Sequence, residues 1–340
     1  MAVPRGCLLR LLAVAVFLAF LCCRGEAAVR ELKVGYYAET CPEAEDIVRE
    51  TMARARAREA RSVASVMRLQ FHDCFVNGCD GSVLMDATPT MPGEKEALSN
   101  IDSLRSFEVV DEIKEALEER CPGVVSCADI VIMAARDAVV LTGGPNWEVR
   151  LGRDDSLTAS QEDSDNIMPS PRANASSLIR LFAGLNLSVT DLVALSGSHS
   201  IGEARCFSIV FRLYNQSGSG RPDPHMDAAY RRALEALCPK GGNEEVTGGL
   251  DATPRVFDNQ YFKDLVALRG FLNSDQTLFS DNARTRRVVK QFSKNQDAFF
   301  RAFIEGMIKM GELQNPRKGE IRRNCRVANC SPVAPRVVDI

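Results

Sequence analysis

The chain has 340 residues, of which 45% are hydrophobic and 26% are charged, as in an ordinary soluble globular protein of one or two domains. Its formal net charge is −3 at pH 7, so it lacks the excess of positive charge that is typical of nucleic-acid-binding proteins. It contains three histidines, His72, His199 and His225, so any imidazole chemistry must use one of them.

The first 28 residues have the pattern of a secretory signal peptide. A charged start precedes an apolar run from Leu11 to Cys22, and small residues follow as far as Ala28. This order predicts a signal peptide over residues 1–28, cleaved near Ala27 or Ala28. A membrane anchor is the alternative, but the apolar run is short for a bilayer span. We therefore expect a secreted mature chain without a membrane anchor.

Apolar residues at helical spacing predict an all-α mature chain with minimal β structure. Ser126 is expected to cap one helix and Thr190 to cap another. The Pro- and Ser-rich stretch from Met168 to Ser177 is the best candidate for a boundary between two helical halves, at about 29–170 and about 171–330, with residues 331–340 as a tail. Helices are predicted over residues 43–61, 105–119, 127–141, 258–268 and 285–310.

Nine cysteines remain after the signal peptide is removed. In an oxidising compartment they predict four disulfides and one surplus thiol. Zinc binding is the alternative, but the gap between Cys74 and Cys79 is wider than the usual ligand pair, and no second Cys-His pair completes a site. Four Asn-x-Ser sequons agree with secretion; they lie at Asn174, Asn186, Asn215 and Asn329.

The first candidate site surrounds His72. Arg68 and His72 are four residues apart, so they share one face of a helix, and Phe71 lies beside them. A permanent cation and a titratable imidazole that face one cavity suit proton transfer with charge stabilisation. Taken alone, such a pair is more often a core histidine with a surface arginine.

A loop rich in oxygen ligands follows directly. Hard oxygen ligands around a turn that contains glycine are what Ca²⁺ prefers, and a bridge between Cys74 and Cys79 would constrain this turn. An ordinary acidic turn is the alternative. The candidate ligands are the side chains of Asp73, Asp80 and Ser82 and the backbone carbonyls of Val76 and Gly78.

The second candidate site surrounds His199, which lies among small residues that allow a large flat group to approach the backbone. Haem iron takes an axial histidine whose other nitrogen usually bonds a carboxylate, and Asp275 is the candidate carboxylate. His225 lies in a proline-rich loop and is interpreted as an exposed structural residue. A second calcium-like cluster comprises Ser200, Asp251, Thr253, Val256 and Asp258.

These motifs together resemble those of the secreted plant haem peroxidases, class III, the family of horseradish peroxidase. The resemblance covers nearly all of the mature chain, from about residue 32 to residue 325. The matching segments are, in order, 68–82, Glu94 with Asn100, 127–129, 143–147, 152–154, 191–202 and 257–259 with 274–276.

The resemblance implies the haem peroxidase fold, in which a distal and a proximal helical half enclose one haem b and the protein binds two Ca²⁺ ions. His72 would be the distal acid–base, Arg68 the distal arginine, and Asn100 the residue that orients His72. His199 would ligate the iron, with Asp275 behind it. The remaining implied roles are Phe71 at the haem, Glu94 at the distal calcium through water, the second cluster at the proximal calcium, and Pro169 at the reducing-substrate site.

The resemblance also implies four disulfides and leaves Cys330 unpaired, although Cys330 would be able to compete with Cys325 for Cys127. In the family, two residues usually separate the aspartate and threonine of the proximal calcium loop. Here only Ala252 separates Asp251 from Thr253, so either the loop is tighter or a ligand differs. The implied disulfides are Cys41–Cys121, Cys74–Cys79, Cys127–Cys325 and Cys206–Cys238.

By the same resemblance, the chain is an enzyme that reduces hydrogen peroxide to water. It would oxidise small phenolic donors in one-electron steps through a high-valent iron–oxo intermediate. We expect a monomer, secreted to the extracellular space or cell wall, with the vacuole as the alternative destination. Competing functions are a haem protein that mainly produces reactive oxygen, a catalytically silent wall-binding protein, and a calcium-binding module without haem. Intact Arg68, His72, Asn100, His199 and Asp275 argue against the silent protein.

Overall fold

The computed structural model describes residues 31–329, so the predicted signal peptide, Cys330 and the tail 331–340 lie outside the described residues. The described chain is mainly helical, with one two-stranded antiparallel sheet, β1 (Glu203–Arg205) and β2 (Thr247–Gly249). The all-α class with minimal β structure is therefore confirmed. The helices are α2 (Ala44–Arg58), α3 (Ser62–Phe75), α4 (Phe107–Arg120), α5 (Cys127–Leu141), α6 (Gln161–Ile167), α7 (Ala175–Gly184), α8 (Val189–Ser196), α9 (Val210–Tyr214), α10 (Ala228–Leu237), α11 (Gln260–Val266), α12 (Asn273–Ser280), α13 (Ala283–Lys294) and α14 (Gln296–Gly311).

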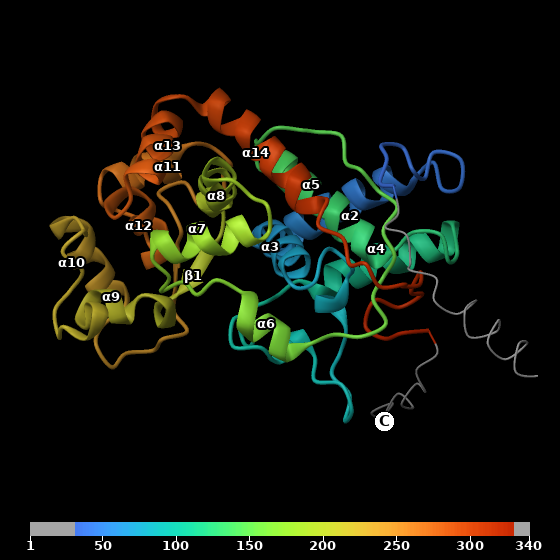
Figure 1. The fold of residues 1–340 in the computed structure, drawn as a ribbon, viewed down its shortest axis with the longest axis horizontal. Coiled ribbons are helices and arrows are strands. Elements are labelled where there is room, and N and C mark those ends of the chain that lie inside the picture. The colour runs from blue at the N-terminus through green and yellow to red at the C-terminus, as the bar shows by residue number, and fades with distance from the viewer. Residues whose placement is uncertain (1–30, 330–340) are drawn as a thin grey trace, which may run out of the picture.

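The helices form two groups that meet at the centre of the molecule. Figure 1 shows α2, α4 and α5 on one side and α9 to α13 on the other, with α3 between the groups. α3 packs against α5, and α14 packs against both α8 and α3. As a result α14 connects the helix that carries His72 with the helix that leads into the short 3₁₀ turn Gly197–Ser200, which carries His199.

Local signals explain where most helices begin. Ser126 caps α5 as predicted, since its hydroxyl accepts a hydrogen bond from the Asp129 amide at 3.1 Å. The prediction that Thr190 caps the next helix is wrong. Ser188 caps α8 instead, in a reciprocal pair with Asp191, because this pair satisfies two backbone amides at once.

Of the five predicted helices, only 127–141 has its predicted bounds; 43–61 and 105–119 are observed as Ala44–Arg58 and Phe107–Arg120, and the other two differ as follows. The predicted helix over 285–310 is two helices, α13 and α14, separated by Asn295, whose extended backbone breaks the first and whose side chain accepts from the Ala298 amide at 2.9 Å to cap the second. The predicted helix over 258–268 is shorter, because the Asp258 carboxylate accepts from the Gln260 amide at 2.7 Å and Leu268 has a positive φ of 59°.

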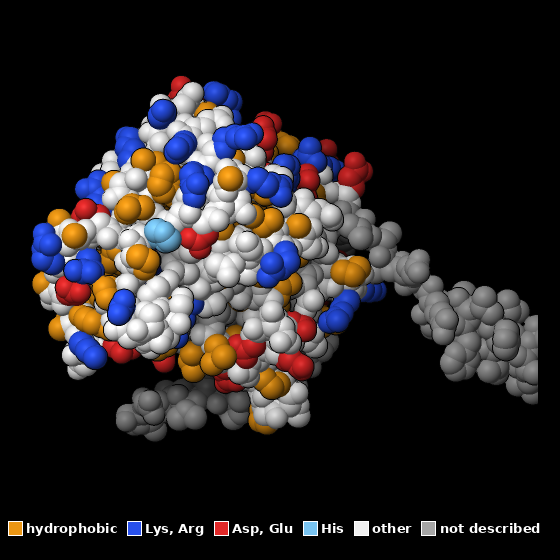
Figure 2. Space-filling model, turned by 60° about the vertical axis from the view of Figure 1, so that its left-hand side comes forward, with side chains coloured by type: hydrophobic (Ala, Val, Ile, Leu, Met, Phe, Trp, Pro, Cys, Tyr) orange, Lys and Arg blue, Asp and Glu red, His pale blue; other side chains and the backbone are white. Residues whose placement is uncertain are grey.

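Four disulfides connect the described chain, and they are the four pairs that the resemblance implies: Cys41–Cys121, Cys74–Cys79, Cys127–Cys325 and Cys206–Cys238. A large cluster of buried apolar residues joins the two helix groups, and a smaller cluster surrounds Cys206–Cys238. On the face shown in Figure 2, Lys and Arg side chains are scattered among acidic and apolar ones. No single helix within residues 31–329 is long and apolar enough to cross a membrane; only a pair bent by 111°, Ala175–Gly184 with Val189–Ser200, matches by length and composition.

Candidate functional site

The side chains of Arg68 and His72 lie together on one face of α3. Arg68 Nε donates to His72 Nε2 at 2.9 Å, as expected for residues one helical turn apart. The ring of Phe71 is half-buried and meets the His72 imidazole edge-on, with the ring centres 5.1 Å apart. The structure thus brings a cation, an imidazole and an aromatic ring into one place.

Asn100 determines which nitrogen of His72 carries the proton. The amide nitrogen of Asn100 donates to the Glu94 carbonyl at 2.7 Å, so the amide oxygen is left to accept, and it lies 2.6 Å from His72 Nδ1. Nδ1 therefore carries the hydrogen, and Nε2 is the unprotonated nitrogen, whose lone pair accepts the hydrogen bond from Arg68 Nε. Burial, reinforced by the charge of Arg68, holds the pKa of His72 well below its ordinary value, so the imidazole is neutral.

Two serines that the sequence analysis did not select hold Arg68. Its terminal nitrogens donate to the carbonyl oxygens of Ser99 and Ser103 at 3.0 and 3.1 Å, and to the Ser103 hydroxyl at 3.2 Å. Burial lowers the pKa of Arg68 to about 10, so the guanidinium remains protonated at neutral pH. Ser99 directly precedes Asn100 and Ser103 follows it by three residues, so their closeness to Asn100 in the sequence is the signal that would have pointed to them.

His199 is supported by a buried carboxylate. Its Nδ1 lies 2.8 Å from Asp275 Oδ1, and Asp275 is 1% exposed, whereas the side chain of His199 is 36% exposed. The predicted His–Asp pair is therefore present in the fold. Tyr261, which the sequence analysis missed, also donates to Asp275 Oδ1, at 3.0 Å. Burial, reinforced by Asp275, raises the pKa of Tyr261 far above its ordinary value, so its hydroxyl is a donor.

The first oxygen-rich loop contains buried acidic groups and buried oxygens without partners. Asp73 accepts from the Gly81 amide, and Asp80 accepts from the Ser82 amide, both at 3.0 Å. Burial, reinforced by Asp80, raises the pKa of Asp73 to about 8, and burial also raises the pKa of Glu94. Oxygens without a hydrogen-bond partner are Asp73 Oδ1, Ser82 Oγ and Glu94 Oε2. Such a set of buried oxygens fits a bound cation.

The backbone of this loop lies against the C-terminal part of the chain. Val76 is fully buried, and Gly78 has a φ of +100° and lies so close to residues 314–315 that a side-chain Cβ would come within 2.5 Å of the Gln314 backbone. The side-chain amide nitrogen of Asn315 donates to Asp80 Oδ2 at 2.6 Å. The close approach of the Gln314 backbone therefore excludes any residue other than glycine at position 78.

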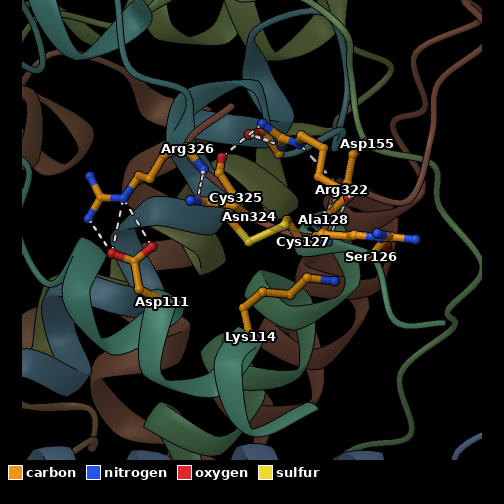
Figure 3. Close-up of a disulfide and its surroundings, with 12 residues drawn as sticks. Asp111, Lys114, Ser126, Cys127, Ala128, Asp155, Arg322, Asn324, Cys325 and Arg326 are labelled. Atoms are coloured by element: carbon orange, nitrogen blue, oxygen red, sulfur yellow. Dashed lines mark hydrogen bonds and ion pairs between the residues drawn. A yellow bond between two sulfur atoms is a disulfide. The ribbon is translucent and has the colours of Figure 1, made fainter. Parts of the chain in front are cut away.

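A buried arginine also connects the C-terminal segment to the loop. Figure 3 shows Arg322 beside the Cys127–Cys325 disulfide. Arg322 is 0% exposed and donates to the carbonyl oxygens of Gly81 at 2.5 Å and Cys325 at 2.9 Å. The Asp155 carboxylate accepts from the Arg322 amide at 2.9 Å and from the first two amides of α5. The disulfide was expected, but none of the hydrogen bonds of Arg322 and Asp155 was foreseen from the sequence.

The second oxygen-rich cluster is assembled despite its shortened segment. The Ser200 hydroxyl lies 3.2 Å from the Val256 carbonyl and 2.9 Å from the Asp258 carbonyl. Thr253 Oγ1 lies 3.2 Å from both carboxylate oxygens of Asp258 and 3.4 Å from Asp251 Oδ2. Burial raises the pKa of Asp251 to about 7. In the described residues, no three His, Cys, Asp or Glu side chains form a metal cluster by themselves, so a cation in either loop would also need carbonyl or hydroxyl ligands.

Two further predicted residues lie apart from these hydrogen-bonded groups. Pro169 is half-buried in the connection between α6 and α7. The side chain of His225 is 55% exposed, with Nδ1 4.0 Å from carboxylate oxygens of Asp223 and Asp281, in agreement with its interpretation as an exposed residue. His72 and His199 therefore remain the two histidines with site-like surroundings.

Comparisons with known proteins agree with this geometry. The sequence profile of the family described as "Peroxidase" matches residues 48–295. The chain is 72% identical to Peroxidase 17 of Arabidopsis thaliana over 302 residues, which cover 89% of this chain and 92% of the relative. It is 50% identical to Arabidopsis Peroxidase 49, over 87% of this chain and 90% of that relative, and 48% identical to Peroxidase N of Armoracia rusticana, over 91% and 94%. The chain therefore belongs to the class III plant peroxidase family, and it is a peroxidase.

Proposed function

We propose that this peroxidase binds one haem b between His72 and His199, reduces hydrogen peroxide to water and oxidises small phenolic donors in one-electron steps. The observation that carries the proposal is the pairing of a neutral His72, which is unprotonated on Nε2, with the Arg68 cation, whose Nε donates to that nitrogen at 2.9 Å. His72 would act on peroxide as a base and then as an acid, and Arg68 would stabilise the charge on the departing oxygen.

The residues around His199 fit haem ligation. Haem iron takes a neutral imidazole whose second nitrogen bonds a carboxylate, and Asp275 supplies that carboxylate at 2.8 Å. The partly exposed His199 ring leaves Nε2 to the ligand, and Phe71 would line the pocket on the His72 side. A haem bound there would supply the redox chemistry.

The protein's own part in the first step is a proton transfer. Once peroxide takes the place of the Arg68 N–H at Nε2 of His72, this nitrogen would accept a proton from one peroxide oxygen and return it to the other, which would leave as water. A bound haem would supply the two electrons for this cleavage. Asn100 keeps Nδ1–H as a donor throughout, so Nε2 remains the basic nitrogen. Ser99 and Ser103 keep the guanidinium of Arg68 directed at the same place. Pro169 would line the site of the phenolic donor.

We also propose one Ca²⁺ ion in each oxygen-rich loop. Support for the distal ion comes from the unpartnered buried oxygens of Asp73, Ser82 and Glu94, which a hard cation would satisfy; Asp80 and the carbonyls of Val76 and Gly78 would complete the set. Support for the proximal ion comes from the convergence of Ser200, Asp251, Thr253, Val256 and Asp258 within one small region.

The remaining proposals concern processing and location. Residues 1–28 would be a signal peptide, and the mature peroxidase domain would span 29–330, with a distal half to about 170 and a proximal half after it. The mature protein would be a secreted monomer of the extracellular space or cell wall. A fluorescent fusion of the full chain would test the location, with retention in the vacuole as the outcome that corrects it.

The haem proposal is tested by absorbance of the purified protein. A Soret band, a pyridine haemochrome spectrum of haem b, and peroxide-dependent oxidation of a panel of phenols are expected. His199→Ala should lose the haem, whereas His225→Ala is the matched control and should retain it. A full haem content in His199→Ala would refute the assignment of His199. Release of reactive oxygen without oxidation of any phenol would refute the donor class.

A further inference from the structure

Tyr261 lies behind the proposed iron ligand and is part of none of the motifs discussed above. It is the second residue of α11 and is 1% exposed. Its ring is perpendicular to that of His199, with the ring centres 6.1 Å apart. The phenol therefore borders the His199–Asp275 pair inside the protein.

The hydroxyl of Tyr261 and the imidazole of His199 share one carboxylate oxygen. Tyr261 Oη donates to Asp275 Oδ1 at 3.0 Å, and His199 Nδ1 lies 2.8 Å from the same atom. The other oxygen, Oδ2, accepts from the Leu272 amide at 3.1 Å. One buried carboxylate thus serves three donors, and hydrogen bonds to a charged group are strong in a low-dielectric interior.

Each donor withdraws some of the negative charge that Asp275 offers to His199. A phenol on Oδ1 itself acts directly, because it occupies a lone pair of the atom that accepts from Nδ1. With less charge on Oδ1, Nδ1 keeps its proton more firmly, and the imidazole is a weaker electron donor through Nε2. Axial-ligand basicity is one of the means by which a protein adjusts the reduction potential of a haem.

We propose that Tyr261 is a positioning residue that limits the electron donation of His199 through Asp275 and so raises the Fe(III)/Fe(II) reduction potential of the enzyme. This inference rests on the proposed function, since it requires haem on His199. The two partners that would transmit the effect come from different elements, with Asp275 in α12 and His199 in the 3₁₀ turn after α8.

A purely structural role for the phenol would be the satisfaction of a buried carboxylate, and the same fold contains a matched example. Tyr37 is 4% exposed and donates to the buried carboxylate of Asp129 in α5 at 2.7 Å. Removal of either hydroxyl leaves a buried carboxylate with one donor fewer, so both losses should destabilise the protein. Only the loss at Tyr261 should affect the electronic state of the haem.

The experiment compares Tyr261→Phe and Tyr37→Phe in haem-loaded enzyme. The readouts are the Fe(III)/Fe(II) midpoint potential by spectroelectrochemistry and the iron–histidine stretch of the ferrous enzyme by resonance Raman. Tyr261→Phe is expected to favour the ferric state by about tenfold, equal to about 59 mV for one electron, and to raise the stretching frequency. Tyr37→Phe should change neither quantity. An unchanged potential in Tyr261→Phe, or equal shifts in both variants, would overturn the proposal.

A second substitution tests the same proposal if the Tyr261→Phe variant does not fold. Incorporation of 3-fluorotyrosine at position 261 keeps the ring and strengthens the hydroxyl as a donor, so it should raise the potential and lower the stretching frequency. A shift in the opposite direction contradicts the inference. Failure of the underlying function is recognised separately: an iron–histidine stretch that is absent from the wild type, or that survives in His199→Ala, would refute the ligand and not the role of Tyr261.

Discussion

Asn100 Oδ1 lies 2.6 Å from His72 Nδ1, and the amide nitrogen of Asn100 is committed to the Glu94 carbonyl. The orientation of Asn100 therefore fixes the tautomer of His72. It also connects the histidine to Glu94, whose own carboxylate faces the distal oxygen-rich loop. The proposed proton transfer and the proposed cation binding would thus share one short segment of backbone.

Replacement of Asn100 by an acidic or an apolar residue should change the reaction with peroxide in two distinguishable ways. In Asn100→Asp, a carboxylate beside Nδ1 raises the pKa of His72, so the base becomes protonated at a higher pH and the rate falls there. In Asn100→Val, Nδ1 loses its acceptor, and the rate should fall by about tenfold or more at every pH. Stopped-flow rates measured across pH check both results; identical pH profiles for the two variants would contradict the assigned role.

Removal of His72 should be more costly than removal of Arg68. General acid–base catalysis contributes about 10²–10⁴-fold, and His72→Ala should approach the upper end because His72 would both accept and donate the proton. Arg68→Leu should cost less, because water and nearby dipoles partly stabilise the departing oxygen. Stopped-flow mixing with peroxide isolates this step, and haem content is the control. An unchanged rate in fully loaded His72→Ala would show that the proton takes another route.

The depressed pKa of His72 predicts a pH dependence of stability. Unfolded His72 titrates near its ordinary pKa of about 6.5, whereas the folded residue stays neutral to a much lower pH. Below about pH 6.5 the unfolded state binds a proton that the folded state does not. The free energy of unfolding is therefore highest above this pH and decreases as the pH falls. The free energy of unfolding of His72→Gln should therefore decline less than that of wild type between about pH 7.5 and about pH 5.5. His225→Gln, at an exposed position, is the control and should follow wild type.

Chelation of calcium should lower both the melting temperature and the rate with peroxide, because buried carboxylates near His72 would be left without a counter-ion. Burial, reinforced by Asp80, raises the pKa of Asp73 to about 8, so cation binding at neutral pH should release a proton, and affinity should weaken as the pH falls. Metal analysis and calcium titrations at two pH values check this. Active enzyme without calcium would defeat the prediction, and a single ion per chain would implicate the shortened segment at Asp251.

Arg322 and Arg326 provide a matched pair of arginines beside one disulfide (Figure 3). Arg322 is fully buried, donates to the Gly81 carbonyl and forms an ion pair with Asp155. Arg326 is partly exposed and forms an ion pair with Asp111 at 2.6 Å. Arg322→Met should lower the free energy of unfolding by about 3–5 kcal/mol, because it leaves the buried Asp155 carboxylate without its positively charged partner. It should also weaken calcium binding at the adjacent loop. Arg326→Met should cost about 1 kcal/mol or less. Equal losses in denaturant titrations would show that burial at Arg322 is unimportant.

Local patterns predicted the parts of the fold that depend on neighbouring residues. The all-α class and the cap at Ser126 follow from periodicity and capping chemistry. Asn295 was missed because apolar periodicity continues across the break between α13 and α14, and a single capping residue interrupts the backbone without interrupting the pattern. The cap at Ser188 was missed because Thr190 is also a capping residue and lies only two positions away.

Contacts between distant segments were predicted only where the family resemblance supplied them. The His199–Asp275 pair spans 76 residues, and spacing alone would not have joined them. Tyr261, Ser103 and Arg322 were missed for the same reason, since each acts through a partner that the fold brings close and has no motif of its own. Tyrosine, serine and arginine are too common to mark a site without the three-dimensional contact.

The contact of Arg322 with Gly81 has a consequence for how the protein is made. The loop that contains Gly78 and Gly81 is synthesised long before its partners at residues 314–322, since Gly81 and Arg322 are 241 residues apart, and the nearby disulfide joins cysteines 198 residues apart. This loop therefore cannot reach its final packing until residues 314–322 have been made. The two ends of this contact should therefore fold and unfold together as one cooperative unit.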